Sequence, residues 1–265
     1  MVTSSVPFAM GQDAPSQGRS WRGLSRRLAR GGLLRLGAVF AAAGLAFQSA
    51  KAQETPDHPQ CVSQLWAAGT QLGRAEAVAR HDTTDDAGML DDMLDAGLHI
   101  EQANALCAQE PPPWPAWPNW RETRDQLATM AEKFQNGHEN RQQLAIGLAV
   151  LQQGLAYQLA FRVLPTHIEH DATCVEIYMR LGVTLGYAQA ATRISGRILP
   201  DAVERLRKAI SLIYQTREMP SRCLDFKGLL PSINAALKTP NDPSIAGHLD
   251  DIVHAADVVA APLTE

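Results

Sequence analysis

Several signals that identify a class of protein are missing from this chain of 265 residues. Aromatic residues make up only 6% of it and charged residues 20%, while the hydrophobic fraction is an ordinary 45%. This composition excludes a collagen-like chain, a fully disordered chain and a polytopic membrane protein. There is no HExxH or GxSxG motif, no Glu-x-x-His pair and no convincing strand alternation. The sequence therefore predicts an all-α protein and offers no catalytic motif, so we expect a protein that is not an enzyme.

Long apolar runs are also lacking, and this decides how the first fifty residues are interpreted. The apolar run Leu36–Phe47 ends after about 12 residues, whereas roughly 20 are needed to cross a bilayer. Arginines precede this run, and the triplet Ala50-Lys51-Ala52 follows it. A basic region, a short apolar core and an Ala-x-Ala exit predict a secretory signal peptide over residues 1–52, with a retained membrane anchor as the alternative. We expect residues 53–265 to form one periplasmic or secreted domain without a membrane span.

The charge of the chain is divided unevenly. Residues 1–52 hold seven bases and one acid, a net charge of +6, within a chain whose formal net charge is −4. Subtracting +6 from −4 leaves −10 on residues 53–265. Because a charge of −10 repels phosphate, we expect no nucleic-acid partner.

The strongest pattern is an internal repeat. Residues 61–80 and 174–193 align without a gap at an offset of 113, with eight of twenty positions identical. About one or two identities would arise by chance from typical residue usage. A second cysteine follows each unit at a similar distance, so the units extend over 61–107 and 174–223. The pattern indicates a duplication.

Apolar periodicity predicts about eight helices. They cover residues 60–80, 85–107, 120–136, 139–163, 168–194, 200–217, 225–238 and 244–259. The breaks between them fall at turn signals such as Gly196 and the prolines around 239–243. Because residues 139–163 are apolar nearly all round, we expect that segment to be the central buried helix.

Each repeat unit is expected to form an antiparallel helical hairpin closed by a disulfide. The chain has four cysteines and no CxxC, CxxCH or zinc-finger spacing. In an antiparallel hairpin the start of the first helix lies beside the end of the second. We therefore predict the bonds Cys61–Cys107 and Cys174–Cys223, which an oxidising compartment would preserve. Free, buried cysteines are the alternative.

Two glycines stand four residues apart in each unit, Gly69 and Gly73 in the first and Gly182 and Gly186 in the second. A glycine inside a helix costs about 1 kcal/mol relative to alanine, so their presence needs a reason. The spacing places a smooth stripe on one helix face, where another backbone can approach closely. We expect the helices at 60–80 and 168–194 to meet each other, or a common partner, along this stripe. The alternative is that the stripe lines a ligand groove.

Three tryptophans in the proline-rich segment between the repeat units are the best candidates for contact with a ligand or partner. Trp114, Trp117 and Trp120 recur every three residues, which is the period of a polyproline helix. Exposed rings in a row would stack on a ligand or a partner protein. The alternative is a hydrophobic lid over the helices at 120–136 and 139–163.

Metal binding is a weaker hypothesis. The helix at 85–107 carries oxygen and thioether groups at helical spacing, and solvated acids and core methionines are the simpler interpretation. These groups are Asp85, Met89, Asp91, Asp92, Met93 and Asp95. The histidine pairs His167/His170 and His248/His254 are further metal candidates, although neither matches a metal-site motif. No cofactor can be assigned from these residues.

Together these patterns predict an exported, non-catalytic helical bundle. It would be built from two duplicated, disulfide-closed hairpins, and it would bind a partner protein or a small apolar ligand. A metal- or cofactor-binding helical bundle is the first alternative, and an enzyme of unidentified class is the second.

The signal-peptide hypothesis has a direct test. We expect the exported protein to begin at Gln53, because the Ala-x-Ala cleavage motif ends at Ala52. Amino-terminal sequencing of the protein recovered from the cell envelope measures this. An intact basic region at that terminus would show that the segment is retained.

Overall fold

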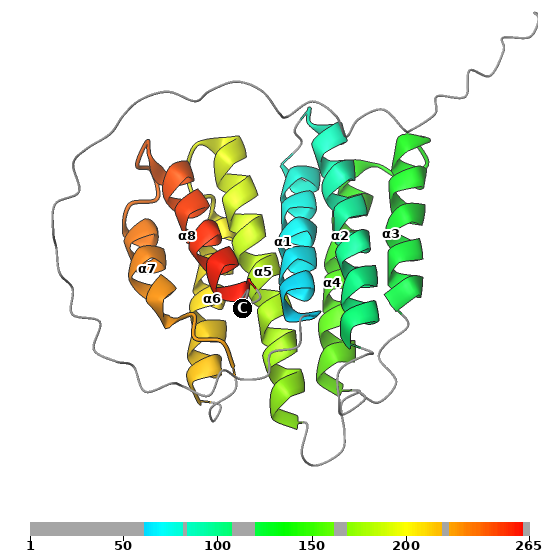
Figure 1. The fold of residues 1–265 in the computed structure, drawn as a ribbon. Helices are drawn as coiled ribbons and strands as arrows, with labels where there is room; N and C mark the ends of the chain where they lie inside the picture. The colour runs from blue at the N-terminus through cyan, green and yellow to red at the C-terminus, as the bar shows by residue number, and fades with distance from the viewer. Residues whose placement is uncertain (1–60, 82–83, 108–119, 162–168, 219–222, 262–265) are drawn as a thin grey trace, which may run out of the picture. The chain divides into compact units, whose positions relative to one another are not determined.

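The computed structural model of the protein describes residues 61–81, 84–107, 120–161, 169–218 and 223–261. The described part is helical, with no strand, so the all-α prediction is confirmed. Eight α-helices and one short 3₁₀ helix follow one another along the chain (Figure 1). They are α1 Cys61–Arg80, α2 Asp86–Cys107, α3 Trp120–Gln135, α4 Arg141–Phe161, α5 Glu169–Ser195, α6 Pro200–Glu218, η1 Lys227–Leu229, α7 Leu230–Lys238 and α8 Ile245–Ala260.

Local signals end and begin these helices close to the predicted positions. Gly196 follows α5 with φ of +68°, a conformation that glycine adopts without strain, and Pro200 opens α6. Between α3 and α4, Gly137 has φ of +71°. Asn140 then caps α4, because its Oδ1 accepts a hydrogen bond from Gln143 N at 2.9 Å while Gln143 Oε1 accepts one from Asn140 N at 2.9 Å.

Helices α1 and α5 pack side by side, and two glycines of α1 allow their backbones to touch (Figure 1). A Cβ atom added at Gly69 would stand 2.3 Å from Met179 O, and one added at Gly73 would stand 2.2 Å from Val183 O. From Gly69 to Gly73 along α1, the contacted residue of α5 changes from Met179 to Val183. Both numbers rise together, so the two helices run parallel. The predicted contact between the helices is confirmed, and the ligand-groove alternative for the stripe is wrong because helix backbone covers these glycines.

The glycines of α5 make the reciprocal contacts. A Cβ atom added at Gly182 would stand 2.7 Å from Trp66 O, and one at Gly186 would stand 2.3 Å from Thr70 O. Each α1 residue in these contacts corresponds to the α5 residue 113 positions later. The corresponding pairs are Trp66 and Met179, Gly69 and Gly182, Thr70 and Val183, and Gly73 and Gly186. The two helices therefore meet through equivalent surfaces, as in a two-fold interface. The duplication itself stays a prediction from the sequence.

The second hairpin, α5 with α6, is closed as predicted by the bond between Cys174 and Cys223, with Cα atoms 5.4 Å apart. The first hairpin, α1 with α2, is antiparallel, since Gln64 near the start of α1 lies 2.7 Å (Oε1) from Nδ1 of His99 near the end of α2. The side chains of Cys61 and Cys107 lie outside the described part, so their bond stays a prediction.

Helices α7 and α8 complete the packing around α5 and α6. Before η1, the Phe226 ring packs at 5.6 Å from the rings of both Trp66 and Tyr178. Trp66 Nε1 donates a hydrogen bond to Asp257 Oδ1 of α8 at 2.6 Å. An aromatic cluster with a satisfied indole N–H thus attaches the carboxyl-terminal helices to α1 and α5.

The central helix is α5, and the prediction that residues 139–163 hold this place is wrong. From Leu181 to Gln189 every residue of α5 is buried. In α4, by contrast, Ile146 is 53% exposed and Val150 is 63% exposed. The cause is the parallel contact between α1 and α5, because these two helices occupy the centre of the bundle and one face of α4 is left exposed to solvent. Apolar composition alone could not show this difference, because α4 is the more apolar of the two helices.

The glycine contact predicts opposite effects for two alanine substitutions. Gly186→Ala places a Cβ against the backbone of Thr70, so we expect the free energy of unfolding to fall by about 2 kcal/mol or more. Gly154→Ala in α4 is the matched control, since no described atom lies within 4 Å of its Cβ position. Better helix propensity should stabilise that variant by up to about 1 kcal/mol. Urea denaturation measures both, and stabilisation by Gly186→Ala would contradict the contact.

Candidate functional site

Helix α4 separates the two hollows that are the best candidate sites. Its buried face, with Leu144, Leu148 and Leu155, packs against α1 and α5. The amide of Gln152 donates a hydrogen bond from Nε2 to Leu72 O at 3.1 Å. At the start of the helix, the Arg141 guanidinium forms an ion pair with Asp86. These contacts hold α4 in place while its outer face remains in solvent.

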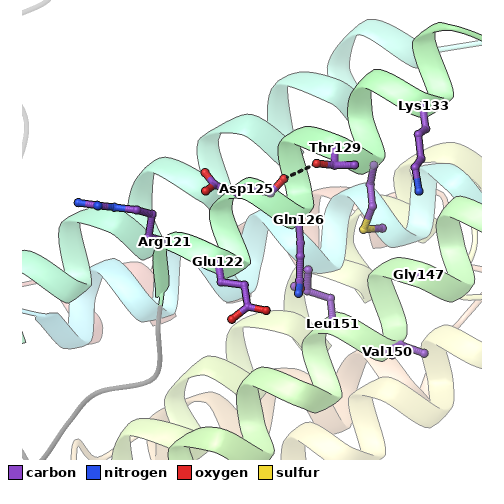
Figure 2. A pocket seen from close by; sticks show the side chains of 10 residues that line it. Arg121, Glu122, Asp125, Gln126, Thr129, Lys133, Gly147, Val150 and Leu151 are labelled. Carbon is purple, nitrogen blue, oxygen red and sulfur yellow. Dashed lines mark hydrogen bonds between the residues drawn. The ribbon is translucent and has the colours of Figure 1, made fainter.

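The first hollow, the α3–α4 groove, has a volume of about 550 Å³. Its apolar lining comes from Met130 of α3 and from Val150 and Leu151 of α4. Figure 2 shows Glu122 and Gln126 extending from α3 toward α4. Charged residues of both signs, Arg121, Glu122, Asp125 and Lys133, form the rim. The groove is therefore an apolar floor with a mixed polar edge.

The groove stays open because α3 packs chiefly on α2. A Cβ atom at Gly97 of α2 would stand 3.2 Å from Arg124 Cγ and 3.9 Å from Leu127 Cδ1, so α3 lies close against α2 there. The face of α3 that carries Gln126 and Lys133 is polar and exposed. Toward α4, only the flexible end of the Met130 side chain fills the space beside Gly147.

The second hollow, which we call the basic cavity, lies among α4, α5 and α6 and has a volume of about 370 Å³. Small and apolar side chains line part of it, including Ala149, Ala156, Met179 and Val183. The rest of the lining is polar, charged or aromatic. These residues are Gln152, Gln153, Tyr157, Glu176, Arg180, Thr184, Arg205 and Lys208.

Three cations gather at the basic cavity, and two of them have acidic partners. Arg180 donates from Nη1 to Glu176 Oε1 at 2.7 Å. Arg205 donates from Nη2 to both carboxylate oxygens of Glu76, at 2.8 and 2.9 Å. Lys208 forms no ion pair with any described residue. The Lys208 side chain is exposed, and its partial desolvation lowers its pKa below the ordinary value, as do the charges of Arg180 and Arg205.

The carboxylate behind the cavity is fully buried. Glu76 is 0% exposed and binds Arg80 Nε at 2.7 Å in addition to Arg205. The guanidinium of Arg205 also lies over the ring of Tyr187, with Cζ 4.6 Å from the ring centroid. Because a buried charge needs such partners, Glu76 holds the Arg205 side chain at the cavity wall.

A hydrogen-bonded cluster continues from Tyr187 to the end of α1. Tyr187 OH donates to Asp201 Oδ2 at 2.5 Å, and His81 Nε2 lies 3.2 Å from the same oxygen. Burial raises the pKa of Tyr187, and its bond to Asp201 raises it further. Burial also acts to raise the pKa of Asp201, but the bond from Tyr187 and the charge of His81 outweigh this effect and lower it. The cluster joins α1, α5 and α6, and no nucleophile completes it as a catalytic group among the described residues.

The helix-2 metal candidates do not converge. Met89 and Met93 are fully buried in the core, which confirms the simpler interpretation of both. Asp91 and Asp95 are exposed, and Asp85 Oδ1 accepts a hydrogen bond from Gly88 N at 2.9 Å. Within the described ranges, no group of three or more histidine, cysteine or acidic side chains could hold a metal ion.

The other predicted site residues are exposed or undescribed. His248 and His254 are exposed on α8, and His248 Nε2 lies 3.3 Å from Ser244 Oγ. His167, Trp114 and Trp117 lie outside the described residues, as do the side chains of His170 and Trp120. The tryptophan hypothesis therefore stays a prediction.

The sequence reasoning missed the cations of the basic cavity. Arg205 and Lys208 are three residues apart on α6, a spacing that puts them on one helix face. Arg180 joins them only through the α5–α6 hairpin. The hydrogen bond between Tyr187 and Asp201 shows which residues of the two antiparallel helices lie opposite each other. Arg180 precedes Tyr187 by seven residues and Lys208 follows Asp201 by seven, so Arg180 and Lys208 lie at the same level of the hairpin. The signal that could have identified these cations is the spacing of three residues on α6 together with the register of the α5–α6 hairpin.

Comparison of the chain with protein-family models, with curated proteins and with solved structures finds no match. None of the described helices is both long enough and apolar enough to span a membrane.

The acidic face of α2 makes a prediction about pH. Burial raises the pKa of Asp92 to about 6, and the neighbouring acids Asp95, Asp85 and Asp91 raise it while Arg74 opposes them. The unfolded chain has the ordinary, lower pKa, so the folded state binds the extra proton between about pH 4 and 6. The contribution of Asp92 to the free energy of unfolding is therefore most favourable below this window and falls as the pH rises through it.

We expect Asp92→Asn to remove this penalty. At pH 7.5 the variant should gain about 1–2 kcal/mol in free energy of unfolding, less than the full shift implies because solvent screens the carboxyl. At pH 4 it should match the unsubstituted protein. Asp251→Asn, at an exposed position on α8, is the control and should change little at either pH. Denaturant melts across this range measure the effect, and an equal gain at pH 4 and 7.5 would contradict it.

Proposed function

We propose that the protein is a non-catalytic, exported binding protein whose α3–α4 groove takes an amphipathic helix of a partner protein. Export is supported by the signal-like segment before Gln53 and by the bond Cys174–Cys223, since disulfides persist in oxidising compartments. The proposal for the groove depends on one observation, a row of exposed apolar side chains on α4.

This row consists of Ile146, Val150 and Tyr157, which are 53%, 63% and 62% exposed. Their spacing of four and seven residues places them on one helix face. Val150 also lines the groove and so joins the row to the apolar floor, while Tyr157 at the other end of the row lines the basic cavity. An exposed apolar surface of this kind, edged by polar residues, marks an interaction site.

The length of the surface favours a helix over a small molecule. From Ile146 to Tyr157 is eleven residues, about 16 Å or three helical turns. A helix laid in a groove presents apolar residues at three- and four-residue steps over this distance. The mixed charges of the α3 rim, among them Asp125 and Lys133, suit a partner helix whose polar edge carries both signs.

Photo-crosslinking in the producing cells identifies the partner. With p-benzoylphenylalanine at Val150, we expect a defined adduct whose crosslinks map to an amphipathic helical segment. The same group at Arg207, an exposed position on α6, is the control and should not form that adduct.

The segment identified in this way is then synthesised and titrated against the purified protein. We expect Val150→Glu to weaken its binding by about tenfold or more, because a charge would face an apolar interface, and Arg207→Glu to leave binding unchanged. The proposal fails if the segment does not bind. It also fails if the apolar dye N-phenyl-1-naphthylamine binds at the groove and no adduct forms, since the groove is then a small-ligand site.

A further inference from the structure

We propose that the basic cavity is a second binding site, for a small organic carboxylate with an apolar body. The cavity is distinct from the α3–α4 groove, because Val150 and Leu151 line only the groove, and the two hollows adjoin at Tyr157, which belongs to the exposed row on α4 and lines the cavity. Three independent features of the cavity lead to the proposal: its charge, its lining and its prearranged side chains.

The charge of the cavity favours an anion. Lys208 is level with Arg180 across the hairpin and lies near Arg205, and it forms no ion pair with a described residue. Glu204 and Glu76 attract its ammonium, yet they do not outweigh its partial desolvation and the charges of the two arginines. Cations placed together at a hollow repel one another, and an anion bound among them would remove that repulsion. Residues 53–265 carry a formal net charge of −10, so this group of cations is opposite in sign to the segment as a whole.

The lining favours a carboxylate that carries an apolar group. Ala149 and Ala156 of α4 and Met179 and Val183 of α5 give the cavity an apolar wall. Inorganic phosphate would meet the cations and leave this wall uncovered. A volume of about 370 Å³ is at the small end of the range for ligand pockets, which excludes a nucleic acid or a folded partner from the cavity.

Two of the three cations are held in place before any ligand arrives. Glu176 fixes Arg180 within α5, and the buried Glu76 fixes Arg205 from behind while the ring of Tyr187 lies against its guanidinium. Side chains that are already ordered lose little entropy when a ligand binds. Lys208 is the remaining cation, and we assign to it the role of pairing with the carboxylate.

Octanoate is the probe, because it joins a single carboxylate to an apolar chain. Isothermal titration of the purified full protein should show saturable binding of octanoate, with octanamide binding about tenfold more weakly or not at all. The amide has the same body and lacks the charge, so the comparison isolates the cations. Inorganic phosphate should not compete with octanoate at equal concentration.

Variants on α6 locate the site. We expect Lys208→Met to weaken octanoate binding by about tenfold, Lys208→Arg to retain it within about threefold, and Arg207→Met to leave it unchanged. Arg207 is exposed on α6 as Lys208 is, but it does not line the cavity, so Arg207→Met is the matched control for the loss of one charge. Circular dichroism and thermal melts verify that all three variants fold.

Three results would overturn the inference: equal affinity for octanoate and octanamide, unchanged binding in Lys208→Met, or effective competition by phosphate. Val150→Glu separates this site from the groove, since it should leave octanoate binding intact. Loss of octanoate binding in Val150→Glu would place the ligand in the α3–α4 groove instead. Failure of the partner experiment above, with octanoate binding retained, would leave the basic cavity as an independent site.

Discussion

The contact between the backbones of α1 and α5 sets the position of the other helices. A glycine inside a helix costs about 1 kcal/mol relative to alanine, and four of them stand in this contact. What offsets that cost is the close approach itself, because Gly73 lets the carbonyl of Val183 reach a place where any side chain would stand. The two helices can then share their neighbours: α2, α4 and α8 contact α1, and α4, α6 and α8 contact α5.

The same contact explains why the candidate sites flank α4. Since α1 and α5 occupy the centre, α4 can bury only one face, and its apolar outer residues stay in solvent. Helix α3 does not cover them, because it packs against α2. One helix with a surplus of apolar residues thus borders a groove on one side and a cavity on the other. In physical terms, α4 is more apolar than its place in the bundle requires.

The charged residues connect the core to the basic cavity. Glu76 is buried in α1, and it is stable there because Arg80 and Arg205 neutralise it and donate hydrogen bonds to it. The same interaction holds Arg205 at the wall of the cavity. In the second repeat the position that corresponds to Glu76 is Gln189. This amide forms hydrogen bonds with Arg74 and Asp250 instead. The two repeat segments thus place a charged carboxylate and a neutral amide at corresponding positions, and only the carboxylate, Glu76, binds Arg205 at the wall of the basic cavity.

The sequence alone was sufficient to predict the helices and the contacts that follow from repeated patterns. Apolar periodicity and turn residues such as Gly196 and Pro200 predict about eight helices, the glycine stripe predicts the α1–α5 contact, and the antiparallel hairpin predicts the Cys174–Cys223 bond. These signals are local, or they repeat at a fixed offset, so one chain is enough to detect them. Which helix is central, and which polar groups come together, was decided only by the tertiary structure. Burial depends on what packs against a helix: Val150 is as apolar as a core residue and lies in solvent, while Lys208 meets Arg180 only after α5 and α6 pair in one register.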